Sequence, residues 1–253
     1  LLPALTMVTN LLDLSRFSTN ENDDPISLSE YVEKMPEKQK DIYYISAETK
    51  DQALASPHLE GFKSKKIPVL IMTDAIDQFW LPMVGSFKEK KFTSITQGQI
   101  NLDDLDEKNK DKKKDDKNEK EKKDKEYVDL VAQLKVVLGD QVKDIRLSSK
   151  LTDSPVCLVA DEGDMDIAME QLMAQRDTNY KGAPRILEIN GDHSLIKNMK
   201  SLLSKKENND LVSDAGTLLF EQARLMEGKM PADPAQFSKI MNQFLFCLLY
   251  TSP

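Results

Sequence analysis

Residues 103–126 read DDLDEKNKDKKKDDKNEKEKKDKE, and this run constrains the fold more than any other part of the chain. It holds eleven acidic and ten basic side chains but one large apolar residue, Leu105. Such a segment buries too little apolar surface to offset the entropy lost on ordering. We therefore expect a charged linker at 103–126, or at most a frayed charged helix, between two modules. Its near-neutral charge argues against a nucleic-acid arm, because phosphate binding needs excess Lys and Arg.

The chain has 253 residues, which is enough for two modules with separate cores, expected at 1–102 and 127–246. Its net charge of −8 disfavours nucleic acid and anionic membrane as partners. Cys157 and Cys247 form neither a disulfide framework nor a CxxC pair, which fits a reducing, cytoplasmic compartment. No apolar run is long enough to cross a bilayer. Because the chain begins without Met, we expect it to be a fragment.

The first module alternates helical and β-prone segments. A capping-box pattern at Ser27 and Glu30 marks one helix start. The predicted helices are 28–35, a segment through Leu54, His58, Leu59 and Phe62, and 77–87. The predicted strands are 42–45 (IYYI), 68–72 (PVLIM) and 91–96. This βαβ order indicates an α/β fold, a small three-layer αβα module whose sheet is parallel or mixed.

The second module is predicted to be an α+β domain with a helical end. Its expected strands are 145–151, 155–160 (PVCLVA) and 185–189 (RILEI). Its expected helices are 127–138, 165–175 and most of the chain after His193. Because PVCLVA is apolar throughout, we expect it to be the more central strand.

Two apolar stripes near the end of the chain predict an antiparallel helical hairpin. Gly228 ends the first helix, and Asp233 and Pro234 start the second. The stripes consist of Leu211, Ala215, Leu218, Leu219, Gln222, Ala223 and Met226, and of Phe237, Ile240, Met241, Phe244 and Leu245. Such a hairpin can be completed by a second copy in a two-fold four-helix bundle, or it can pack on its own domain. Periodicity leaves both alternatives open.

Several long blocks resemble the ninety-kilodalton heat-shock chaperone family in its bacterial form. They include SLSEYVEKMPEKQKDIYYISAETKDQALASPHLEGFKSKKIPVLIMTDAID, KKFTSITQG, VKDIRLSSKLTDSPVCLVADEGDMDIAMEQLMAQ and RILEINGDHSLI. The resemblance covers roughly residues 11–245. It implies that the first module is the end of the family's middle domain and that the second is its carboxy-terminal dimerisation domain.

The resemblance also implies a function, that of an ATP-dependent chaperone for unfolded or partly folded client proteins. The family's ATP and Mg²⁺ site lies in an amino-terminal domain that the resemblance does not cover, so we expect no cofactor and no ATPase activity in this chain. It implies a homodimer formed through the residues of the two stripes other than Ala223. It further implies client contact through six residues, which are Phe79, Trp80, Met165, Met169, Leu172 and Met173.

Taken without the resemblance, the same six residues favour a core role, because amphipathic faces usually pack inward. A Met stripe is nevertheless suited to clients of varied shape, since Met repacks at little cost. Two function classes therefore stay open. One is a client-binding, dimerising part of a chaperone, and the other is a structural dimerisation module without client binding of its own.

Motifs for catalysis or metal binding are absent from the sequence. It contains no GxxxxGK[ST], HExxH or GxSxG motif and no paired Cys/His set. The acidic DEGDMD at 161–166 has Gly163 at the wrong position for a calcium loop. His58 and His193 lack a third metal ligand. The final residues 247–253 (CLLYTSP) depart from the family pattern, and we expect a poorly ordered tail without function.

Overall fold

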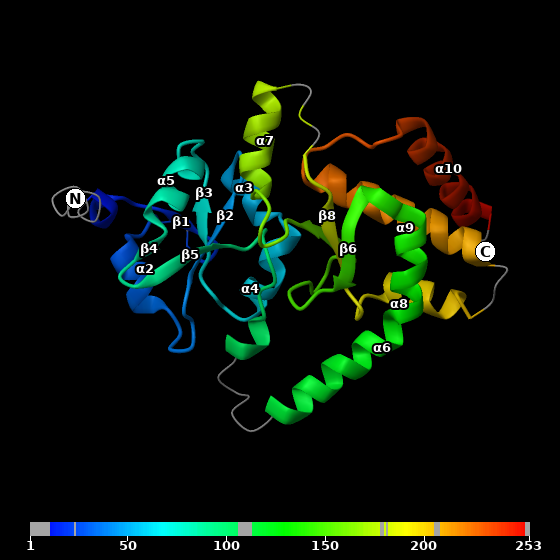
Figure 1. Cartoon of the computed structure of the whole chain (residues 1–253), viewed down its shortest axis with the longest axis horizontal. Coiled ribbons are helices and arrows are strands. Elements are labelled where there is room, and N and C mark those ends of the chain that lie inside the picture. Colours follow the sequence, from blue (N-terminus) through cyan, green and yellow to red (C-terminus); the bar gives the residue numbers. More distant parts are fainter. Residues whose placement is uncertain are drawn as a thin grey trace. The chain divides into compact units, whose positions relative to one another are not determined.

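The computed structural model describes residues 11–22, 24–105, 113–177, 180, 182–204 and 208–250 (Figure 1). Of these, residues 103–104, 113–121, 248 and 250 are described by their backbone alone. The chain forms two compact units, and each mixes helices with a sheet as predicted. The first unit comprises residues 1–111 and 160–183, and the second comprises residues 112–159 and 184–253.

A five-stranded mixed sheet forms the centre of the first unit, in the order β1-β3-β2-β5-β4. The strands are β1 (Ser18–Thr19), β2 (Ile42–Ser46), β3 (Leu70–Met72), β4 (Ser86–Phe87) and β5 (Lys90–Ser94). β2 pairs in parallel with β3 and β5, whereas β1 and β4 add antiparallel edges. The three predicted strands are confirmed. The edge strands β1 and β4 were not predicted, because two residues are too short to show a periodic pattern.

Helices cover both faces of this sheet, because successive strand residues point to opposite faces. Tyr43 and Ile45 pack in a cluster with Phe62, whereas Ile42 packs in another with Leu81. The helices are α2 (Leu28–Lys34), α3 (Lys50–Leu54), α4 (Glu60–Ser64) and α5 (Asp77–Val84). The unit is thus the predicted three-layer αβα module. The helix predicted through Leu54–Phe62 is broken into short pieces at Pro57, because proline cannot donate to the preceding turn.

A buried tyrosine ties α2 to the sheet. The hydroxyl of Tyr31 donates to the carbonyl of Pro68 at 2.6 Å and accepts from Gln39 Nε2 at 3.0 Å and from the amide of Tyr43 at 3.1 Å. The helix begins at the predicted capping box, in which Ser27 and Glu30 exchange backbone and side-chain hydrogen bonds. Local capping therefore sets where α2 starts, and Tyr31 sets where it docks.

The second unit contains a three-stranded sheet in the order β6-β8-β7. The strands are β6 (Val142–Leu147), β7 (Val156–Val159) and β8 (Arg185–Ile189). β8 pairs in parallel with β6 and antiparallel with β7, so the prediction that PVCLVA is the more central strand is wrong. All residues of both β7 and β8 are buried. The apolar sequence of β7 therefore indicated correctly that both of its faces are buried. It did not indicate whether the strand has one or two neighbouring strands in the sheet.

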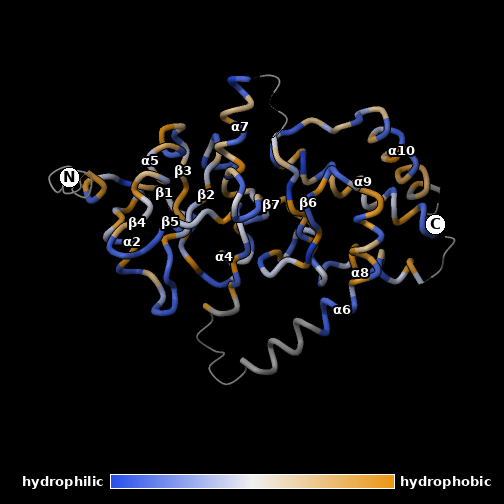
Figure 2. The backbone as a smooth tube through the Cα atoms, in the orientation of Figure 1, coloured by the Kyte–Doolittle hydropathy of each residue, from blue (hydrophilic) through white to orange (hydrophobic). Residues whose placement is uncertain are grey.

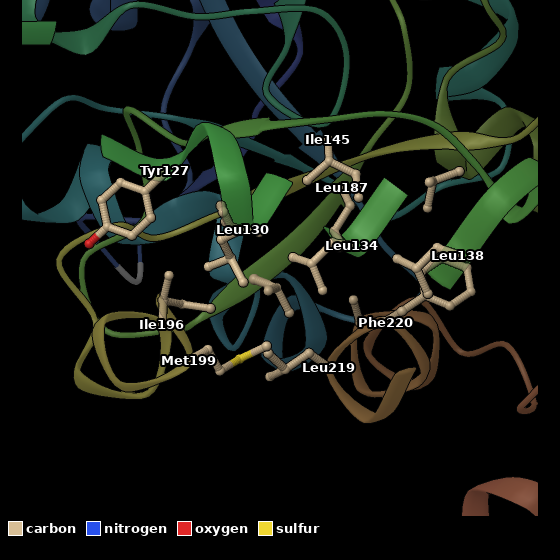
Figure 3. Close-up of a cluster of buried hydrophobic side chains, with 14 of the residues drawn as sticks. Tyr127, Leu130, Leu134, Leu138, Ile145, Leu187, Ile196, Met199, Leu219 and Phe220 are labelled. Atoms are coloured by element: carbon tan, nitrogen blue, oxygen red, sulfur yellow. The ribbon is translucent and has the colours of Figure 1, made fainter. Parts of the chain in front are cut away.

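The α-helices that the structure describes in the second unit are α6 (Lys113–Leu138), α8 (Ser194–Leu202), α9 (Asn209–Met226) and α10 (Pro234–Tyr250). Figure 3 shows the shared core, in which Leu130 and Leu134 of α6 lie near Leu219 and Phe220 of α9. Helix α7 (Ile167–Arg176) belongs to the first unit.

The charged run is helical from Lys113, so α6 begins before the predicted start at Tyr127. Lys123 pairs with Asp192, and Lys200 Nζ lies 2.7 Å from Glu126 Oε2. These ion pairs stabilise the first part of α6 through charged side chains. The prediction used the spacing of apolar residues, which gives no signal for such contacts. Of the predicted linker, residues 106–112 lie outside the described residues.

Helix α10 continues through Cys247 to Tyr250. Residues 247–250 are thus helical, whereas we expected a poorly ordered tail, and residues 251–253 lie outside the described range. The residues CLLY at 247–250 are compatible with a helix, because the helix-breaking Pro of the segment 247–253 is its last residue. In Figure 2, α10 carries both hydrophobic and hydrophilic residues along its length.

Candidate functional site

Exposed apolar side chains mark helix α5 and the residue before it. Ile76 is 64% exposed and Met83 is 86% exposed, and neither was predicted as a site residue. They bracket Phe79, which is half-buried. Their spacing of three and four residues places Ile76, Phe79 and Met83 on one helical face. That spacing is a signal in the sequence that could have identified Ile76 and Met83.

Trp80 of α5 is half-buried and held on three sides. Its ring centroid lies 6.1 Å from that of Phe17 and 5.6 Å from that of Phe92. Its indole Nε1 donates to Asp77 Oδ1 at 2.7 Å. Burial raises the pKa of Asp77 above its ordinary value. Trp80 thus lies beside the apolar face of Ile76, Phe79 and Met83, and it also packs against the core of the first unit.

Helix α7 carries the predicted methionine stripe, except for Met165, which lies two residues before the helix. Its buried residues are Ile167 and Glu170. Met165 is 38% exposed, whereas Met169, Leu172 and Met173 are half-buried. The stripe therefore flanks the buried face of α7 and is neither fully exposed nor fully covered.

The structure divides the predicted self-association residues of α9 and α10 into three groups. Leu219 and Ile240 are buried, at 5% and 3% exposure. The half-buried group is Ala215, Leu218, Phe237 and Phe244. The exposed group is Leu211, Gln222, Met226, Met241 and Leu245. The helices also expose Leu225, Phe246 and Leu249, which were not predicted.

The buried stripe of α9 differs from the predicted one because α9 packs against α6. Val212, Gly216, Phe220 and Ala223 face the core together with Leu219. The helical spacing of apolar residues could not distinguish the side that meets α6 from the side left exposed.

The connection between α9 and α10 is built by local polar contacts. Gly228 has a φ of +76°, which favours glycine at the end of α9. Glu221 accepts a hydrogen bond from the amide of Ala232 at 3.1 Å. Asp233 caps α10 by accepting from the amides of Ala235 and Gln236 at 3.0 and 2.9 Å. The predicted turn between the two helices is therefore present.

Neither a metal-binding cluster nor a membrane-spanning helix is present among the described residues. No group of three or more His, Cys, Asp and Glu side chains in this part of the chain could hold a metal ion. Among the helices described here, none has the length and apolar character needed to cross a membrane.

Comparison with known proteins identifies relatives across most of the chain. The sequence model described as "Hsp90 protein" matches residues 6–251. Chaperone protein HtpG of Roseobacter denitrificans is 42% identical over 229 residues, which is 90% of this chain and 36% of that protein. The proteins of the same name from Paramagnetospirillum magneticum and Streptomyces coelicolor are 39% and 37% identical and match 92% and 88% of this chain.

The matched part is 37% of the Paramagnetospirillum protein and 34% of the Streptomyces protein. This chain therefore spans about a third of the length of the curated relatives that it matches. The resemblance noted in the sequence is confirmed at the level of the family. The chain belongs to the Hsp90 family.

Proposed function

We propose that this chain is the end of the middle domain and the carboxy-terminal dimerisation domain of an ATP-dependent chaperone. The chain would bind unfolded or partly folded clients and homodimerise. Relatives named as chaperones, matched over about a third of their length, support the chaperone role. We assign ATP and Mg²⁺ to parts of the family protein outside this chain, and we assign no catalytic residue here. The observation that carries the proposal is the pair of exposed apolar surfaces, one in each unit.

The proposed client surface in the first unit is the α5 face formed by Ile76, Phe79 and Met83, with Trp80 at its edge. Two of these side chains are more than half exposed. An unfolded segment that covers them removes apolar area from water, and each Å² removed contributes about 25 cal/mol of favourable free energy. Met83 adapts to different client shapes because its thioether chain is flexible.

The test of this surface is binding of fluorescein-labelled, reduced and carboxymethylated α-lactalbumin, measured by anisotropy. We expect Ile76→Ser with Met83→Ser to weaken binding at least tenfold and to leave the native Trp80 emission unchanged. Val136→Ser is the matched control, since Val136 is 80% exposed on α6 of the second unit. Equal affinity of the double variant and the control would contradict this assignment.

The second proposed contact is the α7 stripe of Met165, Met169, Leu172 and Met173. Its half-buried side chains can rotate outward to meet a client, because methionine has three rotatable bonds. We expect Met169→Ser with Met173→Ser to weaken binding of the same labelled client. Unchanged binding by a folded variant would remove α7 from the client surface.

The proposed dimer contact uses the exposed residues of α9 and α10. Leu211, Met226, Met241 and Leu245 offer apolar area that a second copy would bury in a two-fold four-helix bundle. Light scattering over a dilution series should give the mass of a dimer. Leu245→Glu should give a monomer, whereas the control Leu195→Glu on α8 should not change the mass. A monomeric wild-type chain at micromolar concentration would refute the contact.

One observation favours the alternative of a structural dimerisation module without client binding. Trp80 already packs on Phe17 and Phe92, so part of the proposed client surface stabilises the fold itself. Under this alternative the chain dimerises and leaves the aggregation of a model client unchanged. Suppression of aggregation by the wild-type chain would exclude it.

A further inference from the structure

The described residues of the segment 160–183, which are 160–177, 180, 182 and 183, are called here the arm and form a lobe with a single base. The arm follows β7 and precedes β8, and the two strands pair antiparallel with Val159 opposite Ile186. Its two ends therefore emerge side by side. The arm nevertheless groups with the first unit. It carries α7, and contacts with the end of β5 hold it there.

A carboxylate at the start of α7 makes the first of these contacts. Asp166 Oδ2 accepts hydrogen bonds from Ser94 Oγ at 2.5 Å and from Thr96 Oγ1 at 2.8 Å. Its other oxygen accepts from the amide of Ala168 at 2.9 Å and caps α7. Ser94 and Thr96 are 4% and 6% exposed, so the docked arm covers both hydroxyls. One side chain thus starts the helix and docks it.

A glutamine beside these hydroxyls makes the second contact. Gln97 Nε2 donates to the carbonyl of Asp164 at 2.7 Å and lies 3.4 and 3.3 Å from those of Asp161 and Glu162. A parallel β-bridge also joins Gln97 to Ala160. The acidic loop 161–166 is therefore held through its backbone carbonyls, which explains its shape without a bound cation.

Within the arm, the return segment is clasped to α7. Glu170 is 3% exposed and accepts from the amide of Ala183 at 3.2 Å. Gly182 has a φ of +66°, and a Cβ there would lie 2.4 Å from Glu170 Oε1. The helix and the segment that follows it therefore stay together when the docking contacts open.

We propose that the arm is a detachable lobe with a docked and a released state, and that Ser94, Thr96, Gln97 and Asp166 form the latch that selects the docked state. The latch consists of polar groups that water can satisfy when they separate, and Ile167 is the buried apolar residue of α7. Asp166 keeps its capping bond in the released state, so α7 stays helical. The clasp at Glu170 moves the arm as one body.

Hydrogen exchange of the full chain, followed by mass spectrometry, tests the latch. We expect Ser94→Ala with Thr96→Val to speed exchange across residues 160–177 at least tenfold and to leave β8 unchanged. Gln97→Ala should speed the same residues, and the three changes together should do so most. Thr93→Val is the matched control, since Thr93 points to the opposite face of β5 and should leave the arm unchanged.

Acceleration confined to residues 93–97 would mean that the hydroxyls only stabilise β5, and it would overturn the latch. Arm exchange equal to wild type in both variants would also overturn it. If the hydroxyl variant loses the native emission of Trp80, Gln97→Ala decides the outcome, because that change leaves the buried hydroxyls in place. None of these readouts depends on client binding or dimerisation.

Discussion

Gly216 of α9 lies directly against Leu134 of α6. A Cβ added to Gly216 would fall 2.3 Å from Leu134 Cδ2, and Leu134 is 1% exposed, so its side chain would have to shift within the core. The absent side chain therefore sets the distance between the two helices. Ordinary helix propensity would favour alanine here by about 0.5–1 kcal/mol.

Gly216→Ala should destabilise the second unit. Overpacking costs about 1–3 kcal/mol, which exceeds the propensity gain and leaves a net loss of about 1 kcal/mol in the free energy of unfolding. Urea unfolding followed by far-UV circular dichroism measures this loss. Gly163→Ala is the control, because no atom lies within 4 Å of its added Cβ and its φ is ordinary. A Gly216→Ala chain more stable than wild type would contradict the packing argument.

Tyr31→Phe should destabilise the first unit by about 2–4 kcal/mol. The change leaves the Pro68 carbonyl and the Tyr43 amide buried without the hydroxyl that satisfies them. Trp80 is the single tryptophan of the chain and lies in the first unit, so its fluorescence reports this unfolding. Tyr180→Phe, at a side chain that is 38% exposed, should have little effect. Similar urea midpoints for the two variants would argue against the role of Tyr31.

Alkaline pH should weaken the first unit through its buried tyrosines. Burial raises the pKa of Tyr43 to about 12, from an ordinary value near 10. The folded state therefore keeps the phenol proton that the unfolded chain releases. The contribution of Tyr43 is fully present below pH 10 and is lost as the pH rises toward 12, at about 1.4 kcal/mol per pH unit at most.

Tyr43→Phe should flatten this dependence, because phenylalanine does not titrate. Urea unfolding at pH 8, 10 and 11, followed by Trp80 fluorescence, compares the slopes of the two chains. Lysines that titrate in the same range affect both chains equally, so the difference in slope isolates Tyr43. Parallel slopes would show that its phenol is not desolvated.

Glu188→Gln should cost the second unit about 3 kcal/mol. Glu188 is 3% exposed, and its carboxylate lies 2.8 Å from Arg146 Nη2, 2.8 Å from Ser148 Oγ and 3.9 Å from Lys150 Nζ. Removing its charge leaves the neighbouring cations without their buried counter-ion.

Asp192→Asn is the matched change at the surface. Asp192 pairs with Lys123 and Lys197, but its side chain is 66% exposed, so we expect a loss below about 1 kcal/mol. Thermal unfolding of both variants at low and high salt provides the comparison. A loss in stability for Asp192→Asn as large as that for Glu188→Gln would contradict the argument that burial sets the cost of removing each charge.

Local patterns in the sequence determined several features of this protein. The capping box at Ser27, the cap at Asp233 and the inner strands 42–45 and 68–72 follow from interactions between residues a few positions apart. Such interactions are encoded in a short window, so a single sequence is enough to predict them. The long blocks that resemble the Hsp90 family likewise carried the family assignment.

Tertiary structure decided the features that depend on residues far apart in the sequence. β8 is the central strand although β7 is more apolar, and Leu219 of α9 is buried because it meets α6. The hydroxyls of Ser94 and Thr96 meet Asp166 from a distant part of the chain. Strand order, the buried side of a helix and a hydrogen bond between distant residues depend on which elements meet in space. The sequence alone therefore determined the inner strands, the capped helix starts and the family, and packing decided the short edge strands and which elements became neighbours.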